Sequence, residues 1–145
     1  MARIRVEITI EASPQAVWAD VSNLATHPEW MVDAVAIRFL SARREGVGTV
    51  FDCDTKVGPF RLTDRMEVVS WRSGEEIGMR HSGAVTGEGR FTLRGAGVGR
   101  TRFMWEEQLR FPWWLGGPAG AWIGGLVLRP IWRRNLRRLA ARFDH

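Results

Sequence analysis

Most of the chain between Val35 and Phe111 alternates between apolar and polar residues, a pattern typical of β-strands with one buried face. Short runs rich in glycine and serine divide this stretch and predict hairpin turns. Strands that follow one another through hairpins form an antiparallel meander. The six predicted strands are Val35–Ser41, Thr49–Val57, Phe60–Trp71, Glu76–Ser82, Gly87–Arg94 and Arg100–Phe111.

A further strand and two short helices are predicted before this meander. Arg3–Glu11 reads R-I-R-V-E-I-T-I-E, which alternates strictly. Ser13 is suited to an N-cap and Pro14 to the first helical position, so a short helix is expected over Pro14–Val21. A second short helix or turn covers Leu24–Met31. The sequence therefore predicts an α+β protein with a seven-stranded antiparallel sheet.

The last 35 residues carry both the longest uncharged run and the net charge of +5. Phe111–Leu128 has no ionisable side chain, and the residues from Arg129 onward contain six arginines and one aspartate. One face of the sheet needs a cover, and only a helix in this segment is long enough to provide it. An apolar stripe opposite the arginines supports that helix and consists of Trp132, Leu136, Leu139, Ala140 and Phe143.

Glycine and proline give this helix a particular shape. Gly116, Gly120 and Gly124 are four apart, so one side of the helix is flat and leaves room for a ligand or a close approach to the sheet. Pro130 predicts a kink near Trp122–Leu126. We expect a helix of this kind to act as a gate over a cavity.

The same tail raises two other interpretations. A membrane span over Phe111–Leu128 is disfavoured by two prolines and five glycines, and by the arginines that would have to cross the bilayer. A nucleic-acid arm is disfavoured because the arginines lack interleaved aromatics apart from Trp132. Peripheral membrane contact stays open, since Trp113 and Trp114 are good interfacial residues beside a basic helix face.

Length and cysteine content limit the number of domains and the cellular compartment. A chain of 145 residues is expected to form one domain, residues 1–145. The single cysteine, Cys53, excludes an internal disulfide and fits a reducing compartment. Met1–Glu11 alternates and does not resemble a signal peptide, so a cytoplasmic location is expected.

Several short motifs resemble the START-like superfamily, also called SRPBCC, and in particular its polyketide cyclase/dehydrase branch. They are Ala12-Ser13-Pro14, Val17-Trp18, Val21-Ser22-Asn23, His27-Pro28-Glu29-Trp30 and, near the other end, Leu128-Arg129-Pro130 as in bacterial members. The resemblance covers the whole chain. It implies a helix-grip fold, in which the sheet wraps around the C-terminal helix and encloses an apolar cavity. Members bind lipids, polyketides and other hydrophobic molecules, and some catalyse cyclisation or dehydration.

Three ionisable residues fall on strand faces that are otherwise apolar. Asp64, His81 and Glu107 each alternate in step with the apolar residues of their own strand. A charge in an apolar cavity must shift its pKa, find a partner or reach water. Groups perturbed in this way inside a cleft are candidates for function.

The hairpins give an approximate register for these groups. One row holds Asp64, Gly83, Gly87 and Glu107, and the next holds Met66, His81, Gly89 and Trp105. In this register His81 is a diagonal neighbour of Asp64, whereas Glu107 lies roughly 14 Å from Asp64. The hypothesis is that His81, oriented by Asp64, is a general acid or base and that Glu107 is a second polar anchor. The structural alternatives are a bulge that shifts the parity, or mutual pairing near the cavity mouth.

The ligand is expected to contact inward-facing residues of the sheet and the helix: Trp30, Phe51, Cys53, Met66, Met79, Phe91, Trp105, Glu107, Trp122 and Leu126. Cys53 is interpreted as a packed small hydrophobe, because no base is evident beside it. No residue spacing indicates a metal or another cofactor.

The first prediction of function is the binding or carriage of a hydrophobic small molecule, such as a lipid, polyketide or other aromatic, in a cavity between the sheet and the helix. One alternative is a polyketide cyclase or dehydratase that uses His81 and Asp64 as acid and base. Another is a membrane-proximal or protein-interaction module that uses Trp113, Trp114 and the arginine face. No nucleic-acid partner is expected, and the protein is expected to be a monomer or homodimer.

Overall fold

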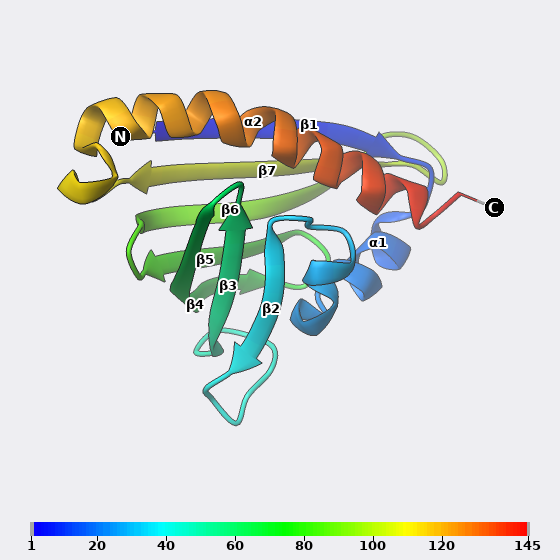
Figure 1. Ribbon diagram of the computed structural model, residues 1–145. Coiled ribbons are helices and arrows are strands. Elements are labelled where there is room, and N and C mark those ends of the chain that lie inside the picture. Colours follow the sequence, from blue (N-terminus) through cyan, green and yellow to red (C-terminus); the bar gives the residue numbers. More distant parts are fainter. Residues whose placement is uncertain (1, 145) are drawn as a thin grey trace.

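A computed structural model describes residues 2–144 and shows one curved sheet with a long helix laid along it (Figure 1). The N-terminal part is β1 (Ala2–Ile10), the helix α1 (Pro14–Val21) and the 3₁₀ turn η1 (Leu24–Glu29). The meander follows as β2 (Ala34–Phe39), β3 (Val50–Val57), β4 (Phe60–Arg72), β5 (Glu76–Ser82), β6 (Thr86–Gly95) and β7 (Thr101–Arg110). The chain then forms the 3₁₀ turn η2 (Trp113–Leu115) and the helix α2 (Gly117–Ala141).

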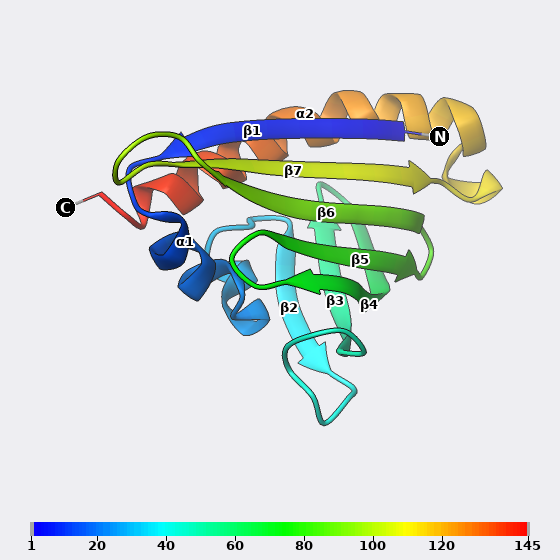
Figure 2. The ribbon, with the colours of Figure 1, turned by 180° about the vertical axis from the view of Figure 1, so that it is seen from behind.

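The strands form a single antiparallel sheet in the order β1-β7-β6-β5-β4-β3-β2. The first strand therefore pairs with the last, and α1 and η1 carry the chain from β1 to β2 at the opposite edge (Figure 2). A register shift between Val68 and Ser70 in β4 and another between Ala34 and Ala36 in β2 interrupt the ladders. Irregularities of this kind bend strands. The predicted helix-grip architecture is confirmed, with strand ends moved by one or two residues.

Local sequence explains how the first helix begins. The Ser13 side chain accepts a hydrogen bond from the backbone N–H of Ala16 at 3.2 Å, and Pro14 occupies the first helical position. A side-chain cap satisfies one of the N–H groups that a helix end leaves free. Val17 and Val21 of α1 are fully buried. The predicted start of α1 is therefore confirmed.

The tail departs from the prediction at its start. It does not become α-helical at Phe111, because η2 intervenes and Gly116 adopts a left-handed conformation with φ of 91°. A non-glycine residue is strained in that conformation, and Gly116 so allows the chain to turn into α2. The helix then continues without interruption through Pro130 to Ala141. It packs chiefly against β1 and also against β7.

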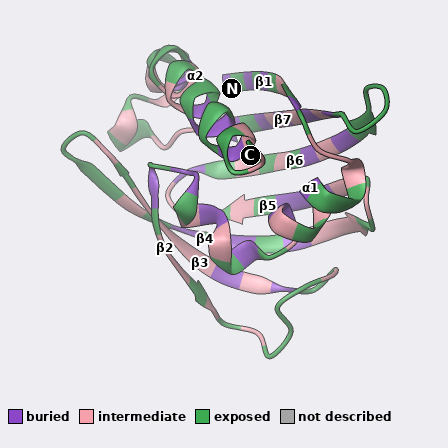
Figure 3. Cartoon of the chain, turned by 90° about the vertical axis from the view of Figure 1, so that its right-hand side faces the viewer, coloured by how far each residue is buried: buried purple, intermediate pink, exposed green. Residues whose placement is uncertain are grey.

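The hydrophobic core lies between the sheet, the N-terminal helices and the C-terminal half of α2. Trp30 is fully buried and contacts Phe91, Phe103 and Trp105 in tilted or edge-on geometry. The rings of Trp105 and Trp132 stack at 4.3 Å, which joins β7 to α2. Figure 3 shows that the outer side of α2 stays exposed. Packing fills the space beneath one half of α2 and leaves the other half over a cavity.

Candidate functional site

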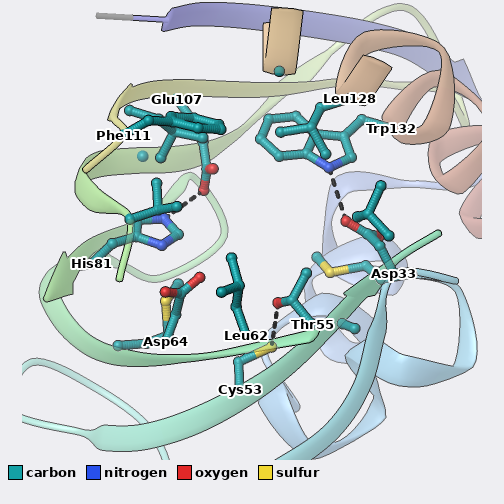
Figure 4. A pocket seen from close by; sticks show the side chains of 18 of the residues that line it. Asp33, Cys53, Thr55, Leu62, Asp64, His81, Glu107, Phe111, Leu128 and Trp132 are labelled. Atoms are coloured by element: carbon teal, nitrogen blue, oxygen red, sulfur yellow. Dashed lines mark hydrogen bonds and ion pairs between the residues drawn. The ribbon is translucent and has the colours of Figure 1, made fainter. Parts of the chain in front are cut away.

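A cavity of about 450 Å³ lies between the N-terminal half of α2 and the concave face of the sheet. Its wall is predominantly apolar and includes side chains from β2 to β7, from Phe111 and from α2. Figure 4 shows the few polar groups that face this space, among them Asp64, His81 and Glu107. An apolar cavity with a small number of polar groups is typical of a small-molecule site.

The glycines of α2 shape the roof of the cavity. Gly116, Gly120 and Gly124 all line it, as their spacing of four predicts. A Cβ atom at Gly124 would lie 2.5 Å from the ring Cζ of Phe111, so the absence of a side chain there lets the Phe111 ring pack under the helix. The flat helix side thus holds one aromatic ring and leaves the remaining space empty.

His81 and Glu107 form a buried pair on the floor of the cavity. The imidazole Nε2 and the carboxylate Oε1 are 2.9 Å apart, and the two side chains are only 10% and 9% exposed. The pair spans β6, because His81 belongs to β5 and Glu107 to β7. Gly89 of β6 permits this crossing, since a Cβ atom there would lie 2.5 Å from Cγ of Glu107.

The register differs from the predicted one around this pair. Met66 pairs with His81 as predicted, but His81 pairs with Gly87 and Glu107 pairs with Gly89. The predicted rows are therefore wrong by two residues from β5 to β6 and again from β6 to β7. Both registers place Glu107 diagonally from His81 across β6, and in the structure the carboxylate that hydrogen-bonds the imidazole is Glu107 and not Asp64.

Neighbouring charges and burial act in opposite directions on the pKa of His81. Burial alone would lower the pKa of His81, but the charge and hydrogen bond of Glu107, with the nearby charge of Asp64, raise it above 6.5. Burial raises the pKa of Asp64 above its usual 3.8, and the attraction of His81 offsets part of that rise. The surroundings of His81 therefore favour its protonated form more than water does.

Two polar atoms in the described part of this site lack a protein partner. They are Nδ1 of His81 and Oδ1 of Asp64, and both are buried. When His81 is protonated, Nδ1 is a donor, while a carboxylate oxygen is an acceptor. Buried polar atoms without partners are costly, so the site is suited to a ligand group that both donates and accepts hydrogen bonds.

A third buried carboxylate, Asp33, has a structural role that the sequence analysis missed. Its Oδ2 accepts a hydrogen bond from Nε1 of Trp132 at 3.0 Å, and its Oδ1 accepts one from Nδ2 of Asn135 at 2.7 Å. Asn135 in turn accepts from the N–H of Val32 at 3.0 Å. Burial raises the pKa of Asp33 despite these donors. Asn135 lies within the apolar stripe of the tail. A polar residue on that buried face was the sequence signal for a buried hydrogen-bonding partner.

Most of the predicted contact residues line the cavity, and three do not. Trp30 is fully buried in the core, and Trp122 and Leu126 are exposed on the outer side of α2. The helix phase was wrong: Ile123 and Val127, one position later, line the cavity instead. The predicted residues that do line it are Phe51, Cys53, Asp64, Met66, Met79, His81, Phe91, Trp105 and Glu107.

Cys53 faces the cavity without the properties of a nucleophile. Burial raises the pKa of its thiol to about 12, so the thiolate is scarce at neutral pH. The sulfur lies 4.0 Å from the hydroxyl of Thr55. This environment suits the interpretation of Cys53 as a small packing side chain.

Residues 2–144 contain no group of three or more His, Cys, Asp or Glu side chains placed to hold a metal ion. Over the same residues, no helix combines the length and the apolar character that crossing a membrane requires.

Comparison with known proteins decides the family. Residues 1–144 match the family described as polyketide cyclase / dehydrase and lipid transport. The chain belongs to this family. None of the curated proteins matches the sequence significantly. The predicted membership of the polyketide cyclase/dehydrase branch is therefore confirmed across the chain.

Several solved structures share the fold at low sequence identity. A protein from Thermus thermophilus superposes with a TM-score of 0.80 at 16% identity, over 97% of this chain and 96% of that one. A START superfamily protein from Mycobacterium smegmatis gives 0.78 at 14% identity, over 99% and 97%. The Zhui aromatase/cyclase from Streptomyces sp. R1128 gives 0.77 at 15% identity, over 97% and 92%. These likenesses show the fold.

Proposed function

We propose that this polyketide cyclase/dehydrase family member binds or carries a hydrophobic small molecule in the cavity beneath α2. The observation that carries the proposal is an apolar cavity of about 450 Å³ whose floor holds the His81–Glu107 pair and Asp64. Ligand cavities are commonly about 300–1,000 Å³ with a few oriented polar groups. The proposed ligand is a lipid, polyketide or other aromatic with one polar end.

The two unpartnered atoms suit the polar end of the proposed ligand. A hydroxyl or phenol placed between Nδ1 of His81 and Oδ1 of Asp64 would accept from the first and donate to the second. The rest of the ligand would contact the apolar wall and Phe111. The proposal places this carrier in the cytoplasm, where a free thiol such as that of Cys53 stays reduced.

Native mass spectrometry of the intact protein tests ligand binding directly. The purified protein is expected to carry an organic molecule that denaturation releases and that has a long apolar part. His81→Ala should reduce its occupancy, whereas Val98→Ser, on the exposed hairpin between β6 and β7, should leave it unchanged. A protein that purifies empty and takes up neither fatty acids nor polycyclic phenols would overturn the proposal.

A second candidate function is cyclisation or dehydration with His81 as acid or base. The specific observation in its favour is the buried, hydrogen-bonded His81–Glu107 pair with an open Nδ1, since a positioned general acid or base contributes about 10²–10⁴-fold to a rate. The neighbouring aromatase/cyclase fold is compatible with it. With a poly-β-keto thioester as substrate, His81→Ala and Asp64→Ala should each lower turnover at least about a hundredfold. If both variants keep affinity and turnover, the acid–base hypothesis is wrong.

A further inference from the structure

Exposed apolar side chains gather around the mouth of the cavity. Trp113 is 86% exposed, Trp122 70% and Phe60 59%, which is unusual for residues of this size in a folded protein. We call the whole group the apolar rim; its members are Phe60, Trp113, Trp114, Trp122, Ile123, Leu126 and Val127. Phe60, Ile123 and Val127 also line the cavity. The apolar rim is therefore continuous with the interior of the proposed ligand site.

The ionisable side chains in the two segments that carry the apolar rim have one sign. The segments are residues 56–62, at the turn between β3 and β4, and residues 110–143, near the end of the chain. Every ionisable side chain in both segments is basic. Along the outer side of α2 the surface changes from apolar residues before Arg129 to arginines after it. Arg133, Arg134 and Arg137 are exposed there and make no ion pair among the described residues. The surface thus combines apolar and cationic parts.

We propose that the apolar rim and the arginines after it dock on an anionic phospholipid bilayer, with the mouth of the cavity against the lipid. Tryptophan prefers the boundary between headgroups and acyl chains, and arginine is attracted to anionic headgroups. Trp122 and Arg133 are roughly 16 Å apart along the helix axis. A slight tilt therefore lets the apolar half enter the interface while the arginines stay among the headgroups.

The charge pattern also argues against other occupants. A second copy of this chain docked through the same face would bring arginines against arginines, which repel. Nucleic acid would match the charge but offers no hydrocarbon layer for the side chains of the apolar rim. An anionic bilayer supplies both features.

Docking in this orientation would connect the cavity with the membrane interior. A hydrophobic ligand could then move between bilayer and cavity without crossing water. This exchange rests on the proposed ligand binding, whereas the docking itself does not.

Co-sedimentation of the intact protein with vesicles tests the docking. The protein is expected to sediment with vesicles of mixed phosphatidylglycerol and phosphatidylcholine, and weakly or not at all with phosphatidylcholine alone. Binding to the anionic vesicles should decline as salt rises, because screening weakens the attraction of exposed charges.

Exposed positions supply variants that leave the core intact. The triple variant Trp113→Ser, Trp114→Ser, Trp122→Ser should bind anionic vesicles at least about tenfold more weakly, because it removes apolar area that enters the interface. Arg133→Gln and Arg137→Gln should each cost about fivefold. The matched controls Val98→Ser and Arg94→Gln lie away from the apolar rim, on the hairpin between β6 and β7 and on β6, and should bind like the wild type.

Three outcomes would overturn the docking: no sedimentation with anionic vesicles, equal sedimentation of the wild type and the triple tryptophan variant, or a dimer in solution that forms through the apolar rim and excludes vesicles. His81→Ala separates this inference from the proposed function. It should change ligand occupancy and leave vesicle binding unchanged, so either proposal can fail without the other.

Discussion

Two buried histidines border the same cavity, and their surroundings move their pKa values in opposite directions. His27 is fully enclosed, and burial lowers its pKa to about 4, although its Nε2 lies 2.8 Å from the carbonyl of Val21. His81 has Glu107 and Asp64 as neighbours, and their charges raise its pKa above 6.5. The neutral His27 is therefore a packing residue that donates one hydrogen bond, whereas the surroundings of His81 favour the charged form of its ring.

Replacing Glu107 by glutamine tests the source of the His81 shift. Glu107→Gln keeps the size and an oxygen acceptor but removes the charge, so burial should then dominate and the pKa of His81 should fall. NMR titration of the His81 ring measures this pKa in the wild type and in the variant. Glu106→Gln is the matched control, because Glu106 contacts Arg90 on the other face of β7. An unchanged His81 titration in Glu107→Gln would contradict the assigned cause.

His27 predicts how stability depends on pH. The unfolded chain binds a proton on His27 near pH 6.5, but the folded protein resists it until about pH 4. The stabilising contribution is therefore complete above pH 6.5 and is lost as the pH falls toward 4. Between pH 7.5 and 5 the wild type should lose about 2 kcal/mol relative to His27→Gln. Urea unfolding of both proteins at the two pH values measures this difference, and parallel changes would contradict it.

Among the structural elements, β6 shapes the site through its glycines, which leave space over the strand for side chains of its neighbours. Its first residues read T-G-E-G-R, so no apolar side chain faces the cavity until Phe91. The Glu107 carboxylate crosses β6 over Gly89 to reach His81. The composition of one strand thus decides which residues of its two neighbours can meet.

Gly89→Ala should therefore break the buried pair without touching either partner. The new methyl group would lie 2.5 Å from Cγ of Glu107 and displace that side chain. The pKa of His81 should fall as it does in Glu107→Gln, and overpacking should cost about 1–3 kcal/mol of stability. Gly95→Ala on the same strand is the control, since nothing lies within 4 Å of its added Cβ. If Gly89→Ala keeps the elevated His81 pKa, Gly89 does not create the crossing.

The same features explain what could be predicted from the sequence. Strands were predictable because alternation such as that of Ile4, Val6 and Ile10 reports directly on burial. The register of β6 was not predictable, because its glycines supply no apolar alternation that would distinguish two registers. The prediction of which face of α2 points inward was wrong for a similar reason. Before Arg129 the helix has no charged residue to mark its outer side, so Trp122 was placed inside.

At the scale of the whole molecule, the two halves of α2 are held differently. The C-terminal half is tied across the fold: Asn135 and Trp132 bind Asp33, and Arg142 pairs with Asp20 at 2.7 Å. The N-terminal half packs on the sheet through small residues such as Ala121 and Gly125, with the cavity along one side. Among residues 2–144, the polar links from α2 to the segments that precede β2 come from Arg129 and from residues after it.

This asymmetry predicts where the molecule opens. Residues 117–128 should exchange their amide hydrogens faster than residues 131–141, because local opening follows low packing and few tertiary hydrogen bonds. A bound hydrophobic ligand fills the cavity, which lies chiefly under the first half. The amide protection of the first half should therefore rise on binding, while that of the second half changes little. Hydrogen exchange read by mass spectrometry, on protein stripped of ligand and on protein reloaded with it, measures both halves together. Equal protection of the first half in the two states would contradict the idea that it gates the cavity.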